Sequence, residues 1–247
     1  MKCLFEDVNV HYETLNMGEG DVPLVFLHGW GGSTKSFEFF AKEMSKYRPC
    51  VLIDFPPFGH SSEPMHSWNV EKYAGCVLEV LKCVGAEKCD IVAHSFGGRV
   101  ALELAGKHNI CSRLMLTGCA GICRKTFATR CKICLFKFKK FLSKMGLYSK
   151  QKLLHAGSED YKNLSPVMKQ TFQNVVNYDQ RYLFKNISCP TLLVWGRNDT
   201  ATPFCWTKIF KKHIKDCEVI ELDGDHFAYV QNSTKFLKIM QSFLSKE

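Results

Sequence analysis

Three residues of this chain, Ser95, Asp199 and His226, have the types and the order needed for nucleophilic catalysis. Ser95 lies in Ala-His-Ser-Phe-Gly-Gly at positions 93–98, directly after an apolar run and directly before a stretch with helical period. The small residues at positions 93 and 97 allow a tight strand-to-helix turn that exposes a serine hydroxyl. Because that hydroxyl is a poor nucleophile at neutral pH, it needs a base beside it.

His226 is the predicted base, selected from nine histidines by its position. It lies in Asp-Gly-Asp-His-Phe at positions 223–227, after the last apolar run of the chain. His94 is adjacent to Ser95, but strand alternation points its side chain elsewhere, so we expect a structural role. An exposed loop histidine is the alternative for His226, and the order serine, acid, histidine favours the catalytic role.

Asp199 is the predicted third member, the group that holds the imidazole in one tautomer and stabilises its positive charge. It lies in Gly-Arg-Asn-Asp at positions 196–199, just past the preceding apolar run. Asp223 and Asp225 are alternatives, but both lie too close to His226 in the sequence to face its ring from another loop. We therefore expect Asp199 to orient His226.

A glycine-rich loop, His-Gly-Trp-Gly-Gly at positions 28–32, follows an early apolar run. Its glycines permit a backbone whose N–H groups turn toward a developing oxyanion. A phosphate-binding loop is the alternative, but no Lys-Ser or Lys-Thr pair follows as a P-loop requires. His28 ends the apolar run, where we expect it to shape the loop.

Apolar runs alternate with helical patterns along most of the chain. This alternation predicts a mostly parallel sheet with helices on both faces. Lys2–Leu15 is expected to form an antiparallel hairpin at the sheet edge. The expected strands are Val22–His28, Cys50–Asp54, Asp90–His94, Leu114–Thr117, Thr191–Trp195 and Glu218–Leu222. The expected helices are Ser36–Tyr47, Val70–Val84, Phe96–Lys107, Phe204–Lys212 and Thr234–Leu244.

One stretch, residues 122–186, interrupts the alternation with helical pattern and no strand. Ser165-Pro166 is a good helix start, because serine caps a helix and proline suits its first position. We predict a helical lid inserted at 122–186, with residues 1–121 and 187–247 forming the α/β core. The alternative is a set of extra helices on one sheet face.

Four motifs in this order resemble those of the α/β-hydrolase fold superfamily: the loop at 28–32, residues 54–61, the turn around Ser95, and the Asp199 and His226 loops. The second matches the family's Asp-x-Pro-Gly-x-Gly-x-Ser loop, with Pro57 in place of the usual glycine. The chain is most similar to small lidded serine carboxylesterases, including the biotin-pathway esterase that acts on an acyl-carrier substrate. A serine at position 95 argues against the haloalkane dehalogenases and epoxide hydrolases of this fold.

The resemblance implies a serine hydrolase that cleaves esters or thioesters through an acyl-enzyme on Ser95, without a cofactor. It assigns the oxyanion donors to the backbone N–H groups of Trp30 and Phe96, and substrate contacts to His28, Gly29 and Phe227. The expected partner is a small acyl ester, which includes anionic and carrier-bound ones. The alternatives are a carbon–carbon bond hydrolase or lyase with the same triad, and a non-catalytic, receptor-like member of the fold.

The net charge of +9 is concentrated in one segment, since no acidic residue occurs between Glu103 and Glu159. Arg124–Met145 combines apolar residues with eight cations. Three interpretations remain open: a lid with a solvated basic face, a surface that recruits an anionic carrier, coenzyme or carboxylate, and a surface for anionic membranes. We expect no nucleic-acid partner, because the rest of the chain is net acidic and carries no binding motif.

The 13 cysteines form an odd number spread through predicted strands and helices. Buried free thiols in a reducing, cytoplasmic location are therefore expected. Cys119, Cys123, Cys131 and Cys134 fall close together but lack the two tight pairs of a structural zinc site, so we expect no metal. From the acidic residues near its start we expect no secretory signal, and because no apolar window is long enough we expect no membrane-spanning helix.

Overall fold

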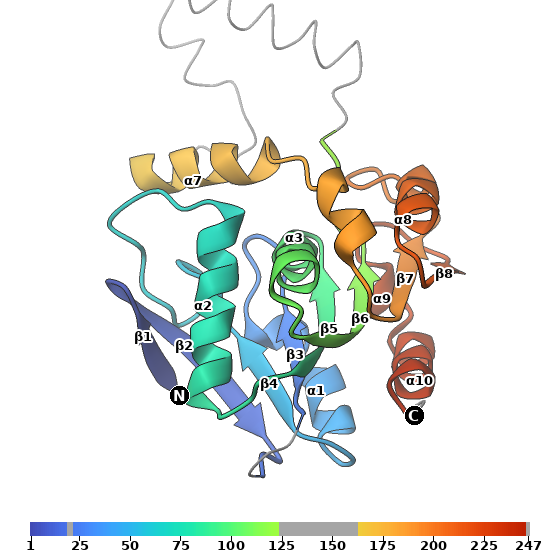
Figure 1. The fold of residues 1–247 in the computed structure, drawn as a ribbon, viewed down its shortest axis with the longest axis horizontal. Helices are drawn as coiled ribbons and strands as arrows, with labels where there is room; N and C mark the ends of the chain where they lie inside the picture. The colour runs from blue at the N-terminus through green and yellow to red at the C-terminus, as the bar shows by residue number, and fades with distance from the viewer. Residues whose placement is uncertain (19–21, 124–162, 246–247) are drawn as a thin grey trace, which may run out of the picture.

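The computed structural model describes residues 1–18, 22–123 and 163–245, which form an eight-stranded sheet flanked by helices (Figure 1). The strand order is β1-β2-β4-β3-β5-β6-β7-β8. β1 and β2 form an antiparallel hairpin, β2 runs antiparallel to β4, and all later pairs are parallel. The strands are β1 (Lys2–Phe5), β2 (Val8–Leu15), β3 (Leu24–Leu27), β4 (Cys50–Ile53), β5 (Cys89–His94), β6 (Cys111–Thr117), β7 (Thr191–Gly196) and β8 (Cys217–Leu222).

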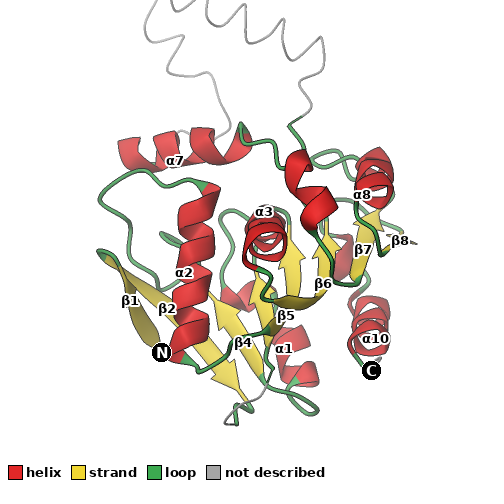
Figure 2. Ribbon diagram, in the orientation of Figure 1, coloured by secondary structure: helices red, strands yellow, loops and turns green. Residues whose placement is uncertain are grey.

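Helices cover both faces of the sheet, as Figure 2 shows. Alternate residues of a strand point to opposite faces. In β3, Val25 and Leu27 pack in the core that contains α2 and α3, whereas Leu24 and Phe26 pack in the core that contains α1 and α10. The helices are α1 (Glu38–Met44), α2 (Val70–Cys83), α3 (Phe96–Glu103), α7 (Pro166–Val176), α8 (Thr207–His213), α9 (Ala228–Gln231) and α10 (Ser233–Leu244).

The predicted α/β class, the edge hairpin and the six other strands are confirmed, with shifts of at most a few residues at their ends. Two expected helices are divided. The helix expected at Phe96–Lys107 is α-helical only to Glu103 and continues as a π-helical turn to His108, before Asn109 adopts a left-handed conformation. The helix expected at Phe204–Lys212 begins with a 3₁₀ turn, Phe204–Trp206, before α8.

The predicted lid is only partly described, because residues 124–162 lie outside the described residues. α7 begins as expected: the Ser165 hydroxyl accepts a hydrogen bond from the backbone of Met168, and Pro166 occupies the first turn. Figure 1 shows α7 across the top of the molecule, above the upper end of α2. Residues 163–186, the part of the predicted lid that the structure describes after the gap, contain α7 and the 3₁₀ helix Arg181–Asn186 and no strand.

The junction between β5 and α3 leaves no room for a side chain at Gly97. A Cβ atom there would lie 2.6 Å from the carbonyl carbon of Leu27 and closer still to its oxygen, so β3 and α3 are in direct backbone contact. Gly98 packs similarly against Cys119, where a Cβ would lie 2.9 Å from the Cys119 Cβ. These contacts fix the direction in which α3 leaves the sheet.

We predict that Gly97→Ala lowers the free energy of unfolding by about 3 kcal/mol or more, because backbone atoms of β3 cannot move aside as a side chain would. Gly85→Ala is the control: Gly85, unlike Gly97, has a positive φ, of 70°, but nothing lies within 4 Å of an added Cβ. That change should cost only the left-handed strain, about 1 to 2 kcal/mol. Urea denaturation of both variants tests this. Equal losses would contradict the tight contact at Gly97.

Candidate active site

Ser95 has an unusual backbone conformation, with φ 51° and ψ −108°, between the end of β5 and the start of α3. Two hydrogen bonds to the neighbouring strand region hold it: its N–H donates to the Thr117 carbonyl over 3.1 Å, and its carbonyl accepts from the Ala120 N–H over 3.1 Å. Such strain persists only where the surroundings over-determine it, and it concentrates at functional sites. Here it presents the hydroxyl beyond the end of the sheet.

His226 lies in the loop after β8, with its imidazole between Ser95 and Asp199. Its Nε2 is 2.9 Å from Ser95 Oγ, and its Nδ1 is 2.8 Å from Asp199 Oδ2. An ionised carboxylate can only accept hydrogen bonds, so Nδ1 carries the proton and the unprotonated Nε2 faces the serine hydroxyl. The three predicted residues are therefore brought together in a continuous hydrogen-bonded chain.

Asp199 is held by donors on both of its oxygens. Oδ1 accepts from the backbone N–H groups of Ala201 (2.9 Å) and Thr202 (2.8 Å), and Oδ2 accepts from the Thr202 hydroxyl (2.8 Å) as well as from His226. Burial on its own raises the pKa of Asp199, but the hydrogen bonds from His226 and Thr202 outweigh it and leave that pKa below its ordinary value. Asp199 is therefore ionised at neutral pH.

The two alternative acids have different surroundings. The carboxylate of Asp225 accepts a hydrogen bond from the backbone N–H of Phe227, and the side chain of Asp223 is 88% exposed, 3.8 Å from Arg197. Thr202 was missed by the sequence analysis, although it bonds Asp199 and lies 3.3 Å from His226 Nδ1. The only signal for it was a hydroxyl residue three positions after the acid in the same loop.

Ser95 opens into a cavity of about 580 Å³. Its wall is mainly apolar, and Trp30 packs edge-on against both Phe96 and Phe172 there. The predicted oxyanion donors, Trp30 and Phe96, both line the cavity beside Ser95. In the described part of the chain, neither backbone N–H makes a hydrogen bond outside helices and strands. The lining comprises Trp30, Ser95, Phe96, Arg99, Ala120, Ile122, Cys123, Phe172, Val175, Val176, Asn177, Ala201, Thr202 and Trp206.

The three residues predicted to contact substrate, His28, Gly29 and Phe227, are absent from the described lining of this cavity, and their contact with substrate stays a prediction. His28 is 1% exposed: its Nε2 accepts from the Phe55 N–H (2.9 Å), so its protonated Nδ1 donates to the Gly29 carbonyl (2.7 Å). Gly29 packs against His94, leaving no room for a Cβ. Phe227 is 52% exposed and packs against the His94 ring. All three shape the loops around Ser95.

His94 has the structural role expected for it. It is buried beneath His226, with ring centroids 4.7 Å apart, and its Nε2 lies 3.0 Å from the His226 carbonyl oxygen, which can only accept. Burial is the main cause that lowers the pKa of His94, to about 3. His94 is therefore neutral and positions the backbone of His226.

Asp54 connects the second motif to the loop at 28–32. Its buried carboxylate accepts from the backbone N–H groups of Thr34 (2.6 Å) and His60 (2.9 Å) and bonds the His11 ring (2.8 Å). Gly59, with φ 59°, leaves no space for a Cβ beside that carboxylate. The unusual Pro57 follows a cis peptide bond. This motif is a structural brace for the loop that carries Trp30.

Eleven cysteines fall in the described residues, all free, and eight of them are buried. Cys83 and Cys205 are exposed, which departs from the expectation of buried thiols. Of the four clustered cysteines, Cys119 is buried, and burial raises the pKa of its thiol. Cys131 and Cys134 lie outside the described residues. None of the described helices combines the length and the hydropathy needed to cross a membrane.

A mostly parallel sheet with Ser95, Asp199 and His226 at the ends of β5, β7 and β8 defines the α/β-hydrolase fold. Residues 22–129 match the family model for that fold, and the chain has the α/β-hydrolase fold.

Comparison with known proteins agrees with this assignment. The chain is 23% identical to the AB hydrolase superfamily protein YisY of Bacillus subtilis, with 96% of each protein covered. It is 22% identical to the pimeloyl-[acyl-carrier protein] methyl ester esterase of Neisseria meningitidis, covering 94% of this chain and 97% of that protein. Among solved structures, MGS-M2, an α/β hydrolase from a deep-sea metagenome library, is similar with a TM-score of 0.80 at 19% identity, covering 100% of this chain and 98% of that one.

Neutral, buried His28 predicts a loss of stability in acid. Burial lowers its pKa from the ordinary 6.5 to about 4, so between these values the unfolded chain binds a proton that the folded chain does not. His28 therefore makes the free energy of unfolding fall by up to about 1.4 kcal/mol per pH unit as pH decreases through this window.

Urea denaturation from pH 7 to pH 4 measures that slope, and His28→Gln should make it shallower by about one proton. The exposed His213, changed to Gln, is the control and should leave the slope unaltered. The interpretation fails if the two variants have the same slope.

Proposed function

We propose that this protein is a serine hydrolase that cleaves carboxylic esters or thioesters through an acyl-enzyme on Ser95. The observation that carries the proposal is the hydrogen-bonded chain Ser95–His226–Asp199, with distances of 2.9 and 2.8 Å, at the wall of a cavity of about 580 Å³. The Neisseria relative, an esterase similar along nearly its whole length, supports the same reaction class.

In the first half of the proposed reaction, Ser95 Oγ attacks the carbonyl carbon and its proton passes to His226 Nε2. The Asp199 carboxylate stabilises the positive charge of the imidazolium. It also accepts the hydrogen bond from Nδ1–H and so holds the ring in its orientation. The N–H groups of Trp30 and Phe96 donate to the oxyanion, since both residues line the cavity beside Ser95. As the intermediate collapses, His226 returns its proton to the leaving alcohol or thiol, and the acyl group remains on Ser95.

In the second half, His226 removes a proton from water, which attacks the acyl-enzyme carbonyl. Collapse of this second intermediate releases the carboxylic acid and returns the proton to Ser95 Oγ. The largely apolar cavity wall, with Phe172, Val175 and Trp206, suits an acyl chain or an apolar alcohol. A small-molecule acyl substrate therefore fits the site better than a large polar one.

Ser95→Ala should reduce hydrolysis of 4-nitrophenyl acetate by about 10⁴-fold or more, because it removes the nucleophile. It should also abolish labelling by a fluorophosphonate probe, which reports an activated serine directly. Ser112→Ala, an exposed serine at the far end of β6, is the matched control and should keep both signals. Wild-type turnover or labelling in the Ser95 variant would disprove the assignment.

Asp199→Asn should lower kcat on the same ester by about 10³- to 10⁴-fold, since an amide can no longer fix the His226 tautomer. The control is Asp223→Asn, which alters an acid whose side chain is 88% exposed and should change kcat little. Steady-state kinetics of both proteins, with circular dichroism to verify folding, distinguish the two acids. A silent Asp199 variant beside a crippled Asp223 variant would transfer the role to Asp223.

A further inference from the structure

Arg99 is a buried cation in the wall of the catalytic cavity. It is the fourth residue of α3, four positions after Ser95, so the two are one helical turn apart, roughly 6 Å along the axis. Arg99 is 5% exposed and lines the same cavity as Ser95. Among the described residues of that lining, it is the one whose side chain carries a full charge.

The described residues satisfy only part of the Arg99 guanidinium. Its Nη1 donates to the Tyr178 carbonyl oxygen over 2.6 Å, and no carboxylate among the described residues pairs with it. Arginine side chains almost never become fully buried without a partner. A guanidinium has five donors in a planar fork that matches the two oxygens of a carboxylate.

The acidic residues closest to Arg99 in the sequence and structure are engaged elsewhere. Glu103, one turn further along α3, pairs with Lys107 (2.5 Å) and accepts from the Tyr178 hydroxyl (3.2 Å). Asp179 forms a two-pronged ion pair with Arg181, with bonds of 2.7 to 3.0 Å. Among the described lining residues, Arg99 is therefore the cation at which the cavity can receive a negative charge.

A structural role would not require arginine at this position. The single bond to the Tyr178 carbonyl joins α3 to the segment after α7, and any neutral donor of similar length would make it. Burial lowers the pKa of Arg99, but arginine remains protonated at neutral pH. Placing a full charge in an apolar wall is unfavourable unless a ligand compensates it, and water exclusion then strengthens the attraction.

We propose that Arg99 binds a carboxylate of the substrate and makes this enzyme prefer esters that carry an acid group a few bonds from the scissile carbonyl. This deepens the proposed function, on which it rests. Arg99 selects the substrate and takes no part in bond cleavage, which remains with Ser95, His226 and Asp199.

The test compares monomethyl glutarate with methyl valerate, in which a methyl group replaces the free carboxylate. The wild-type enzyme should show the higher kcat/KM for monomethyl glutarate. Arg99→Met should reduce the ratio of the two values by about 10- to 100-fold, the usual effect of a charged hydrogen-bonded pair. Most of the change should be in KM, because the contact is made equally in the ground and transition states.

Two further variants sharpen the comparison. Arg99→Lys keeps the charge but loses the planar fork, so its ratio should lie between those of the wild type and Arg99→Met. If Arg99→Met does not fold, Arg99→Lys still tests the proposal. Lys185→Gln removes an exposed cation from the neighbouring 3₁₀ helix and should leave the ratio at its wild-type value. A drop of equal size in Lys185→Gln would mean general electrostatic attraction and would overturn the proposal.

A measurement without turnover separates this proposal from the proposed function. Glutarate should raise the Tm of the wild type more than its neutral diamide does, and Arg99→Met or Arg99→Lys should weaken that difference. If neither ester is hydrolysed, the proposed function fails, and the Tm shifts alone decide the role of Arg99. If the esters are hydrolysed with the same ratio in all variants, or glutarate gives no specific shift in the wild type, Arg99 does not recognise a carboxylate.

Discussion

The site depends on one backbone constraint, the positive-φ conformation of Ser95 (φ 51°, ψ −108°) at the turn from β5 into α3. Hydrogen bonds to Thr117 and Ala120 hold this residue, and the direct backbone contact at Gly97 fixes how α3 leaves the sheet. The same turn exposes the hydroxyl to His226 and directs the fourth residue of α3 into the cavity wall. Nucleophile and buried cation are thus positioned together by a single local geometry.

Around this turn, buried polar groups support the loops that carry the reacting atoms. Neutral His28 bridges the loop containing Trp30 to the start of the Asp54 loop, and His94 bonds the backbone of His226 from below. Asp54 ties the same loops through the Thr34 and His60 N–H groups. Each is fully or almost fully hydrogen-bonded, as buried polar groups must be. These hydrogen bonds therefore fix the loops in position at the end of the sheet.

The sequence predicted the sheet and the three residues of the hydrogen-bonded chain because both leave local patterns: apolar runs for strands, and polar residues placed directly after them. The sequence gives less for contacts decided in three dimensions. The described lining of the cavity does not include His28, Gly29 or Phe227, and their contact with substrate stays a prediction. Arg99 gave no signal, and the only signal for Thr202 was a hydroxyl residue near the acid, because only the rotation of α3 and the path of the Asp199 loop bring the two residues to the site.

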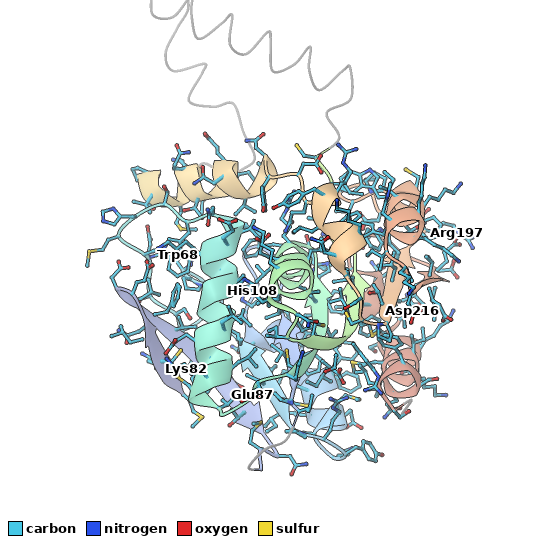
Figure 3. All side chains as sticks on the ribbon, in the orientation of Figure 1. Trp68, Lys82, Glu87, His108, Arg197 and Asp216 are labelled. Carbon is cyan, nitrogen blue, oxygen red and sulfur yellow. The ribbon has the colours of Figure 1, made fainter. Side chains whose placement is uncertain are left out.

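One side of the cavity wall belongs to a part of the chain that carries no catalytic group. Phe172, Val175 and Val176 of α7 line the cavity, and α7 is fastened through Thr171 and Asn174 to both backbone groups of Trp68, which Figure 3 labels beside α2. None of these bonds involves the triad. Substitutions on the inner surface of α7 can therefore remodel the cavity while the serine chemistry stays intact. With this arrangement, related proteins can come to accept different substrates while they keep the same catalytic residues.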